Sequence, residues 1–202
     1  MNPLLRTAIL ALVLCAWSVA AAAQPVPVYD WSRGTTISGF GGFGGDDTGS
    51  GSLFGGSVGW DASPRIAIEG NAAWMQFDGK SDTFSAALKT RVNVVGSRRV
   101  IPFVSAGIGF YHASFEMGAP MPDFYASRVP PGSGKGASLT FNDPSVVLGG
   151  GVDVAITRIM RIRPDVDVSI VVRDSQTYTV PSFRLHLVFV FEDHPVTPAR
   201  RR

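Results

Sequence analysis

The chain has 202 residues, of which 45% are hydrophobic and only 17% are charged, and its formal net charge is +2. High hydrophobicity with little charge excludes a disordered chain, and the near-neutral total argues against a nucleic-acid partner, which needs a concentrated basic patch. The single cysteine, Cys15, excludes an intramolecular disulfide and any multi-cysteine metal site.

Residues 1–23 have the order of a cleaved secretory signal peptide. Arg6 precedes an apolar stretch over residues 7–19, and small residues ending in an alanine triplet at 21–23 follow it. A membrane anchor is the alternative, but the apolar stretch is short for one. We expect cleavage, which leaves a cysteine-free chain that begins at Gln24.

The mature chain reads as strands, because apolar and polar residues alternate with a period of two. In residues 83–95, for example, Phe84, Leu88 and Val92 share one face, while Lys89 and Arg91 share the other. No run of about 18 apolar residues follows Gln24, so a membrane helix is not expected. Eight strands are predicted, over residues 35–45, 52–61, 65–77, 83–95, 100–115, 145–156, 160–173 and 183–191.

The predicted connections alternate in length along the chain. Short turns are expected at residues 62–64, 96–99 and 157–158, and longer links at 46–51, 78–82, 118–140 and 174–177. An even number of strands, with short turns at one end and longer loops at the other, is the pattern of outer-membrane barrels. We therefore predict an all-β chain: a periplasmic N-terminal segment (24–34), an eight-stranded antiparallel up-and-down transmembrane β-barrel (35–192) and a basic periplasmic tail (193–202).

An eight-stranded barrel has an interior just wide enough for side chains to fill it. The bulky apolar face should therefore point to lipid, and the face that mixes small residues with charges should line the lumen. Internal ion pairs without an open pore are predicted among nine charged side chains: Glu69, Lys89, Arg91, Asp153, Arg163, Asp165, Asp167, Arg173 and Arg184. An aromatic girdle is expected from Trp60, Trp74, Phe77, Phe110 and Phe115, which fall near predicted strand ends.

Two stretches near the start of the barrel, LFGGSVGW at 53–60 and PRIAIEG at 64–70, resemble the small outer-membrane β-barrel proteins of the porin-family, opacity-like and OmpA-transmembrane-like type. Residues 102–111 and 148–152 are similar to later strands of these proteins. The resemblance implies a monomer in the outer membrane, in contact with membrane lipid, lipopolysaccharide and the outer-membrane assembly machinery. Members usually end on an aromatic residue; Phe189 and Phe191 supply this pattern, but the chain continues to Arg202.

Two motifs could carry chemistry. Residues 39–44 fit G-x-G-x-x-G, but a nucleotide site needs a helix after it, and residues 46–51 read as a loop, so no cofactor is expected. His112 and Ser114, with Glu116 nearby, are similar to the His-x-Ser pair of lipid A deacylases, which are eight-stranded barrels. We expect a protein without catalytic activity. A lipid A deacylase is the enzymatic alternative.

The longest predicted loop, residues 118–140, is the best place for a specific function, because long loops without structure are usually functional or disordered. It offers Met121, Phe124, Tyr125, Arg128 and Lys135 as candidate contacts to an unknown surface ligand. A loop without a fixed partner is the alternative.

The sequence favours a structural or surface-interaction role. A narrow pore or carrier for small hydrophobic molecules remains a second hypothesis. A secreted soluble barrel of lipocalin type, with the apolar face turned inward, remains a third.

Overall fold

The computed structural model describes residues 34–46, 49–77, 81–94, 99–116, 121–129, 138–157 and 159–192. The predicted signal peptide, the basic tail and the N-terminal segment except Gly34 lie outside these residues, as does Lys135. Within the described residues, no helix is long and apolar enough to cross a membrane.

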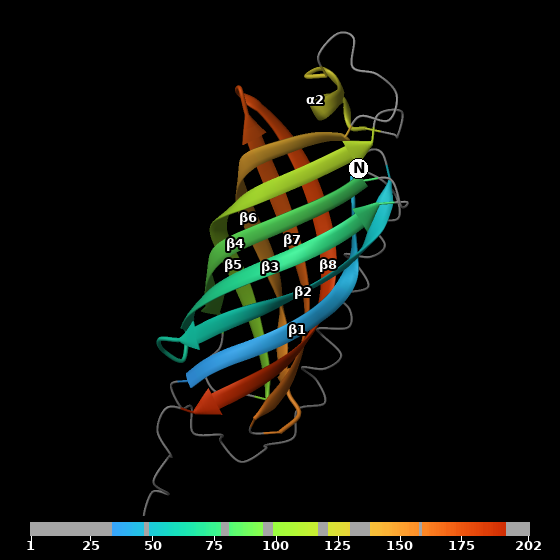
Figure 1. Cartoon of the computed structure of the whole chain (residues 1–202). Coiled ribbons are helices and arrows are strands. Elements are labelled where there is room, and N and C mark those ends of the chain that lie inside the picture. The colour runs from blue at the N-terminus through green and yellow to red at the C-terminus, as the bar shows by residue number, and fades with distance from the viewer. Residues whose placement is uncertain are drawn as a thin grey trace, which may run out of the picture.

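Eight strands close into one barrel in which each strand is antiparallel to the next and the last strand pairs with the first (Figure 1). They are β1 (Gly34–Gly45), β2 (Ser50–Asp61), β3 (Ile66–Phe77), β4 (Ser81–Asn93), β5 (Val100–Glu116), β6 (Ser138–Ala155), β7 (Met160–Arg173) and β8 (Gln176–Glu192). The prediction of an all-β, eight-stranded up-and-down barrel is confirmed. The glycine motif at residues 39–44 lies within β1 and opens no helix.

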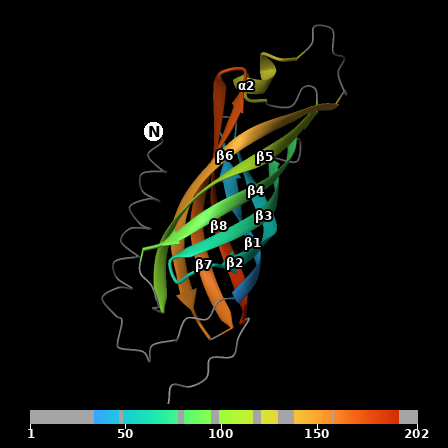
Figure 2. The same ribbon diagram turned by 90° about the vertical axis from the view of Figure 1, so that its left-hand side faces the viewer.

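The two ends of the barrel differ. The turn end carries Gly34, Glu192 and the connections between β2 and β3, β4 and β5, and β6 and β7. The loop end carries the other connections and a four-residue helix, α2 (Asp123–Ala126), which lies beside the tip of the β7–β8 hairpin in two perpendicular views (Figures 1 and 2).

Two connections at the loop end differ from the expected ones. Strand β6 begins at Ser138, so the end of the predicted 118–140 loop is strand. The link predicted over residues 174–177 is a two-residue turn, in which Asp174 and Ser175 have φ angles of 48° and 64°. Two consecutive positive φ values are typical of the type I′ turn, whose twist matches that of a β-hairpin.

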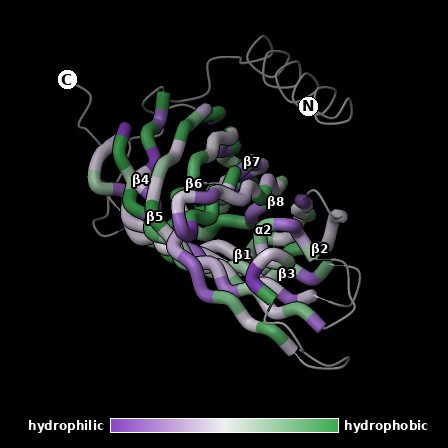
Figure 3. Tube along the Cα trace, turned by 90° about the horizontal axis from the view of Figure 1, so that it is seen from above, coloured by the Kyte–Doolittle hydropathy of each residue, from purple (hydrophilic) through white to green (hydrophobic). Residues whose placement is uncertain are grey.

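Side chains sort onto the two faces of the barrel wall as the alternation predicts, and the hydropathy along the tube changes accordingly (Figure 3). Ile108 is 70% exposed and Leu88 is 57% exposed on the outside, whereas Lys89 and Arg163 are buried in the lumen. The lipocalin-type alternative is therefore wrong, because its apolar face would have to point inward.

The aromatic girdle was predicted only in part. Trp60, Trp74 and Phe110 are exposed on the outer wall, but Phe77 and Phe115 are buried inside the barrel. Both inward residues lie close to the loop end, where the lumen is apolar. Proximity to a strand end did not by itself decide which way these rings point.

Near the loop end, β5 and β6 exchange the roles of their two faces. Beyond Phe110, the outward positions of β5 are polar, at His112 and Ser114, while Ala113 and Phe115 point inward and are buried. The same change occurs in β6 on the loop-end side of Pro144. Because an outward polar row suits water and an outward apolar row suits lipid, we place the boundary of the hydrocarbon region at Phe110 and Pro144.

This boundary predicts that a charge is tolerated on one side of it and not on the other. Ile108→Arg should lower the free energy of unfolding by up to about 2–4 kcal/mol, the cost of a cation at the middle of the apolar band, whereas Thr140→Arg should cost about 0–1 kcal/mol. Reversible urea unfolding in phospholipid vesicles measures both. Equal losses for the two variants would contradict the boundary.

Candidate functional site

The half of the lumen nearer the turn end is filled by a single network of buried charges, which we call the lumen network. Its carboxylates are Asp61, Glu69, Asp153, Asp165 and Asp167, and its cations are Lys89, Arg91, Arg161, Arg163 and Arg184. Five negative charges thus meet five positive ones. An electrically balanced, hydrogen-bonded arrangement is the condition under which charges can be buried at all.

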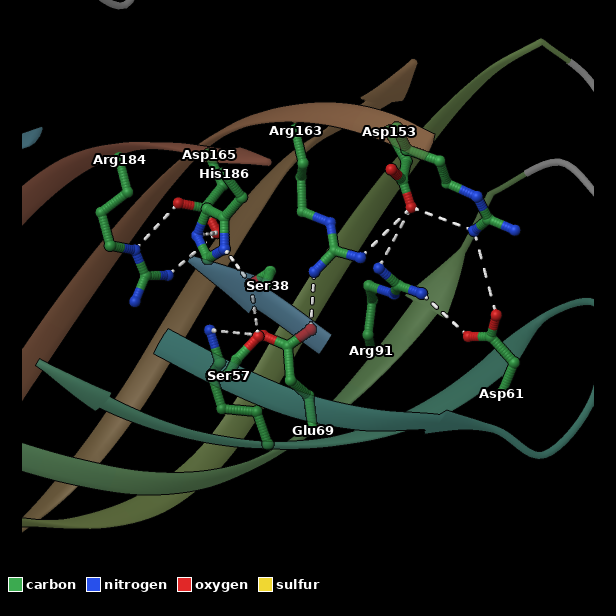
Figure 4. Close-up of polar contacts among 12 residues, drawn as sticks. Ser38, Ser57, Asp61, Glu69, Arg91, Asp153, Arg163, Asp165, Arg184 and His186 are labelled. Atoms are coloured by element: carbon green, nitrogen blue, oxygen red, sulfur yellow. Dashed lines mark hydrogen bonds and ion pairs between the residues drawn. The ribbon is translucent and has the colours of Figure 1, made fainter. Parts of the chain in front are cut away.

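Arg163 is the centre of one half of the lumen network. Its side chain is 1% exposed, and its two terminal nitrogens lie 2.6 Å from Glu69 Oε2 and 3.3 Å from Asp153 Oδ2. Figure 4 shows this guanidinium between the two carboxylates. Asp153 Oδ2 also accepts from Arg91 at 3.2 Å, and Arg91 reaches Asp61 at 3.0 Å. With Arg161 at 3.4 Å, one carboxylate oxygen therefore joins three arginines from two strands.

Arg184 is the centre of the other half. It holds Asp165 in a bidentate pair, with Nε and Nη2 each 2.9 Å from a carboxylate oxygen, and it also contacts Asp167. Lys89 joins the two halves, since its Nζ lies 2.9 Å from Asp167 Oδ2 and 3.9 Å from Glu69 Oε1. The planar fork of arginine suits such two-point contacts better than an ammonium group does.

A chain of polar contacts extends the network to β1 and β2. His186 Nε2 lies 3.3 Å from Asp165 Oδ2, and its Nδ1 lies 3.0 Å from the hydroxyl of Ser38. Ser38 in turn contacts Ser57 at 2.8 Å. On β5, the ring of Phe103 lies beneath two guanidinium groups, 5.4 Å from Arg91 and 5.6 Å from Arg163. All eight strands therefore contribute to this half of the lumen.

Strand register explains why these charges meet. Glu69 is directly opposite Lys89, and Asp165 is directly opposite Arg184. Glycine leaves room for the Asp167 carboxylate. Gly149 pairs with Asp167, and a Cβ atom built on Gly149 would lie 1.9 Å from Asp167 Oδ1. A larger residue at this position would displace the carboxylate from the network.

The half of the lumen nearer the loop end is apolar and aromatic, and we call it the aromatic core. Its buried members are Phe40, Leu53, Ala73, Met75, Phe77, Tyr111, Ala113, Phe115, Tyr125, Phe141, Val171, Tyr178 and Val180. A cavity of about 20 Å³ lies where it meets the lumen network, lined by Tyr111, Asp167 and Arg184 among others. That volume holds about one water molecule.

Helix α2 closes the barrel mouth by inserting Tyr125 into the aromatic core. The Tyr125 side chain is fully buried, and its ring centre lies 4.7 Å from Phe141, 5.2 Å from Phe115 and 5.6 Å from Tyr178. Burial raises the pKa of its hydroxyl above the ordinary value, so this group stays protonated. Phe124 stacks on the outer side of Tyr178 at 5.5 Å.

Arg128 fastens the segment after α2 to the β7–β8 hairpin. Its guanidinium donates to the backbone carbonyl of Phe124 and, at 3.2 Å, to Gln176 Oε1, and it lies 3.8 Å from Asp174 Oδ2. It also covers the Phe124 ring at 4.4 Å. These contacts hold α2 over the mouth.

The structure places the residues predicted from the sequence in three groups. Eight of the nine lumen candidates join the lumen network, while Arg173 lies apart at the loop end, where it pairs with Asp143 at 3.1 Å. Among the loop candidates, Met121 and Phe124 are half-buried against the aromatic core. Tyr125 faces inward, which corrects its expected role as an outer contact: its ring fills the barrel mouth.

Four side chains with ion-pair contacts in the lumen were not among the candidates, namely Asp61, Asp143, Arg161 and His186. The alternation of inward and outward residues could have identified Asp61, Asp143 and His186, since each shares the inward face of its strand with buried neighbours. Asp61 ends its strand and reads as a turn residue, and Asp143 precedes the predicted start of the sixth strand.

His112 and Ser114 face outward on β5, as the deacylase alternative requires, but each bonds to β6. His112 Nδ1 lies 2.7 Å from Asn142 Oδ1, and Ser114 Oγ lies 3.2 Å from Ser138 Oγ. A nucleophile needs a hydrogen bond to its base. The described contacts of Ser114 do not supply one, so the geometry does not favour this alternative.

Comparison with known proteins agrees with this architecture. Residues 7–191 match the family described as outer membrane protein beta-barrel domain, and the chain belongs to this family. It is therefore an outer-membrane β-barrel protein. No curated protein matches the chain.

Several solved structures share the fold at low identity. Neisserial surface protein A superposes with a TM-score of 0.58 at 11% identity, covering 79% of this chain and 97% of its own. The N-terminal barrel domain of OprF from Pseudomonas aeruginosa gives 0.55 at 13%, covering 78% and 98%. Ail of Yersinia pestis, in complex with the heparin analogue sucrose octasulfate, gives 0.50 at 14%, covering 80% and 100%.

The central position of Arg163 predicts a large effect of its removal. Arg163→Met leaves Glu69 and Asp153 buried without their shared cation, and should cost about 3–5 kcal/mol of unfolding free energy. Arg161→Met is the matched control: Arg161 lies at the edge of the network, 3.4 Å from Asp153 and 3.9 Å from Asp61. Its loss should cost less than that of Arg163, because Asp153 keeps Arg91 and Arg163 and Asp61 keeps Arg91. Urea unfolding in vesicles measures both losses of unfolding free energy. A smaller loss for Arg163→Met than for Arg161→Met would contradict the assignment of Arg163 as the centre.

The insertion of Tyr125 predicts protection of the neighbouring backbone. Tyr125→Ala should release α2 and speed tryptic cleavage after Arg128 by about tenfold, because cleavage needs local opening and removal of a buried ring makes opening easier. Thr140→Ala, at an exposed position on β6, serves as the control. An unchanged cleavage rate in Tyr125→Ala would show that the ring does not hold the segment.

Proposed function

We propose that the protein is a closed, monomeric outer-membrane barrel with a structural and surface-interaction role. The loop end faces the exterior and the turn end faces the periplasm, as the general distribution of loop lengths in such barrels suggests. Its membrane partners are outer-membrane lipid and lipopolysaccharide, and the assembly machinery inserts it.

The observation that carries the closed state is the continuous filling of the lumen. The lumen network occupies one half and is neutral, so no unpaired cation or carboxylate is left over among its ten charges to conduct an ion. The aromatic core occupies the other half, and α2 covers it. Moving an ion through would require breaking buried pairs, which is strongly unfavourable.

The surface-interaction role rests on the order of the loop end. Arg128 and Tyr125 fix α2, so Met121 and Phe124 are held in place at the mouth and do not need to be ordered when a partner binds. Preorganised surfaces bind with less entropic cost. The complex of Ail with sucrose octasulfate is a precedent for ligand binding by a barrel of this fold.

Planar lipid bilayers distinguish the closed barrel from the narrow-pore alternative. The purified protein should give no stable single-channel current, while a porin measured under the same conditions confirms that the assay detects insertion. Reproducible open-channel steps from the wild-type chain would overturn the closed state and favour a pore.

A further inference from the structure

The ring of Tyr125 occupies a pocket whose walls belong to the barrel and not to α2. The walls are Phe115 on β5, Phe141 on β6 and Tyr178 on β8, whose ring centres lie 5.2, 4.7 and 5.6 Å from that of Tyr125. Phe115 and Phe141 also contact each other, at 6.2 Å. Strands position side chains more rigidly than loops do, so the pocket is a built feature of the barrel. We call it the mouth pocket.

The mouth pocket has a polar end at Asp143. This residue is 2% exposed, and its Oδ1 lies 3.1 Å from a guanidinium nitrogen of Arg173. Burial is the main cause that raises the pKa of the Tyr125 hydroxyl, and Tyr111 and Asp143 add to it, which places the carboxylate beside that hydroxyl. Neither the hydroxyl nor Asp143 Oδ2 has a well-formed hydrogen bond to a residue that the structure describes. Tyr125 therefore fills the apolar part of the pocket but leaves a buried acceptor without its donor, which is unfavourable.

A free ring with a hydroxyl group fits the mouth pocket better than the tethered one. The position of the Tyr125 ring is set by α2, whereas a free phenol can shift until its O–H donates to Asp143 Oδ2. Hydrogen bonds to a charged acceptor are stronger than those between neutral groups. A ring without a hydroxyl would leave the carboxylate unpaired, and an anionic ring would be repelled by it. The pocket thus selects a neutral phenol.

The segment that carries Tyr125 depends on the pocket for its own stability. Helix α2 has four residues, and its N-cap residue, Pro122, makes no side-chain capping bond. Outside the barrel mouth, Arg128 reaches Asp174 at 3.8 Å, but the Asp174 side chain is 80% exposed. Exposed ion pairs contribute little, and so short a helix is not stable alone. Burial of Tyr125 and stacking of Phe124 on Tyr178 therefore hold α2 in place.

We propose that the mouth pocket binds a small neutral phenol, a single aromatic ring with a hydroxyl group, and that Tyr125 is the built-in competitor for this site. Binding displaces the Tyr125 ring and opens α2. The lumen network lies beyond the aromatic core, so the ligand is held at the mouth and is not passed through the barrel. The inference rests on the proposed surface-interaction role for access from the exterior, but binding by the purified chain does not depend on which end faces outward.

Fluorine NMR titration of the purified mature chain in detergent tests the site with two ligands: 4-fluorophenol, and fluorobenzene as the same ring without the hydroxyl. Tyr125→Ala removes the competitor and should bind 4-fluorophenol more tightly than wild type does, because a mostly closed site lowers the apparent affinity. This variant should bind fluorobenzene about tenfold more weakly than 4-fluorophenol, since the carboxylate then stays unpaired. Tyr125→Phe, which keeps a ring in the pocket, is the matched control for uptake by the detergent and should bind no more tightly than wild type.

Variants of Asp143 test the polar end. In the Tyr125→Ala chain, Asp143→Leu should abolish the preference for 4-fluorophenol over fluorobenzene. If this double variant does not show the heat-modifiable gel migration of a folded barrel, Asp143→Asn replaces it and should reduce the preference, because a neutral acceptor is weaker than a carboxylate.

Tryptic cleavage after Arg128 tests exchange in the wild type. At about ten times the dissociation constant measured for Tyr125→Ala, 4-fluorophenol should speed cleavage about tenfold, because a ligand that binds only the open state raises its population by that factor. Fluorobenzene at the same concentration should speed cleavage by only about twofold, as its weaker binding implies.

Two results would overturn the proposal. The first is equal affinity of Tyr125→Ala for the two ligands, or no binding of either, since the pocket would then not recognise a phenol. The second is a wild-type cleavage rate that 4-fluorophenol leaves unchanged, since Tyr125 would then not exchange with a ligand. Both results would leave the closed lumen untouched, because the bilayer measurement tests that state separately.

Discussion

The hydrocarbon region of a membrane offers no water to backbone N–H and C=O groups, so every strand must be paired on both sides. The pairing of β8 with β1 meets this requirement in the chain described here. Closure with eight strands also fixes the radius, which leaves a lumen that side chains must fill. The contents of that lumen follow from this geometry: glycines where carboxylates need room, and long side chains that reach across from one wall to another.

The two halves of the lumen are filled by different kinds of side chain. Near the turn end, it holds charges that neutralise one another, with Arg163 joining β7 to β3 and β6. Near the loop end, it holds aromatic rings and closes with Tyr125. On β5 and β6 this change lies near the edge of the apolar band: beyond Phe110 and Pro144 the outward positions are polar, while Phe115 and Phe141 are buried inside. The interior of the loop end therefore resembles the core of a water-soluble protein.

Much of this could be predicted from the sequence, because a period of two assigns each residue of a long strand to one face. The strand number, the outward apolar face and the shared lumen face of Lys89, Arg91 and Arg163 all follow from it. Phe115 was expected on the outside because it lies near a strand end, although the alternation places it on the inward face of Tyr111. Alternation cannot show where the surroundings change from lipid to water, so β6 was expected to start too late. The alternation also gives no distances between side chains. The separation of Arg173 from the lumen network depends on barrel tilt and register, which only the folded chain fixes.

The central claim is that the lumen network is one coupled unit that holds the barrel together. A double-mutant cycle on Arg163→Met and Glu69→Gln, with unfolding free energies measured in phospholipid vesicles, tests it most directly. If the two side chains stabilise the barrel through their contact, the double variant should lose less than the sum of the single losses, by about 0.5–3 kcal/mol. Losses that add to within about 0.5 kcal/mol would contradict the claim, because additivity is the behaviour of independent sites.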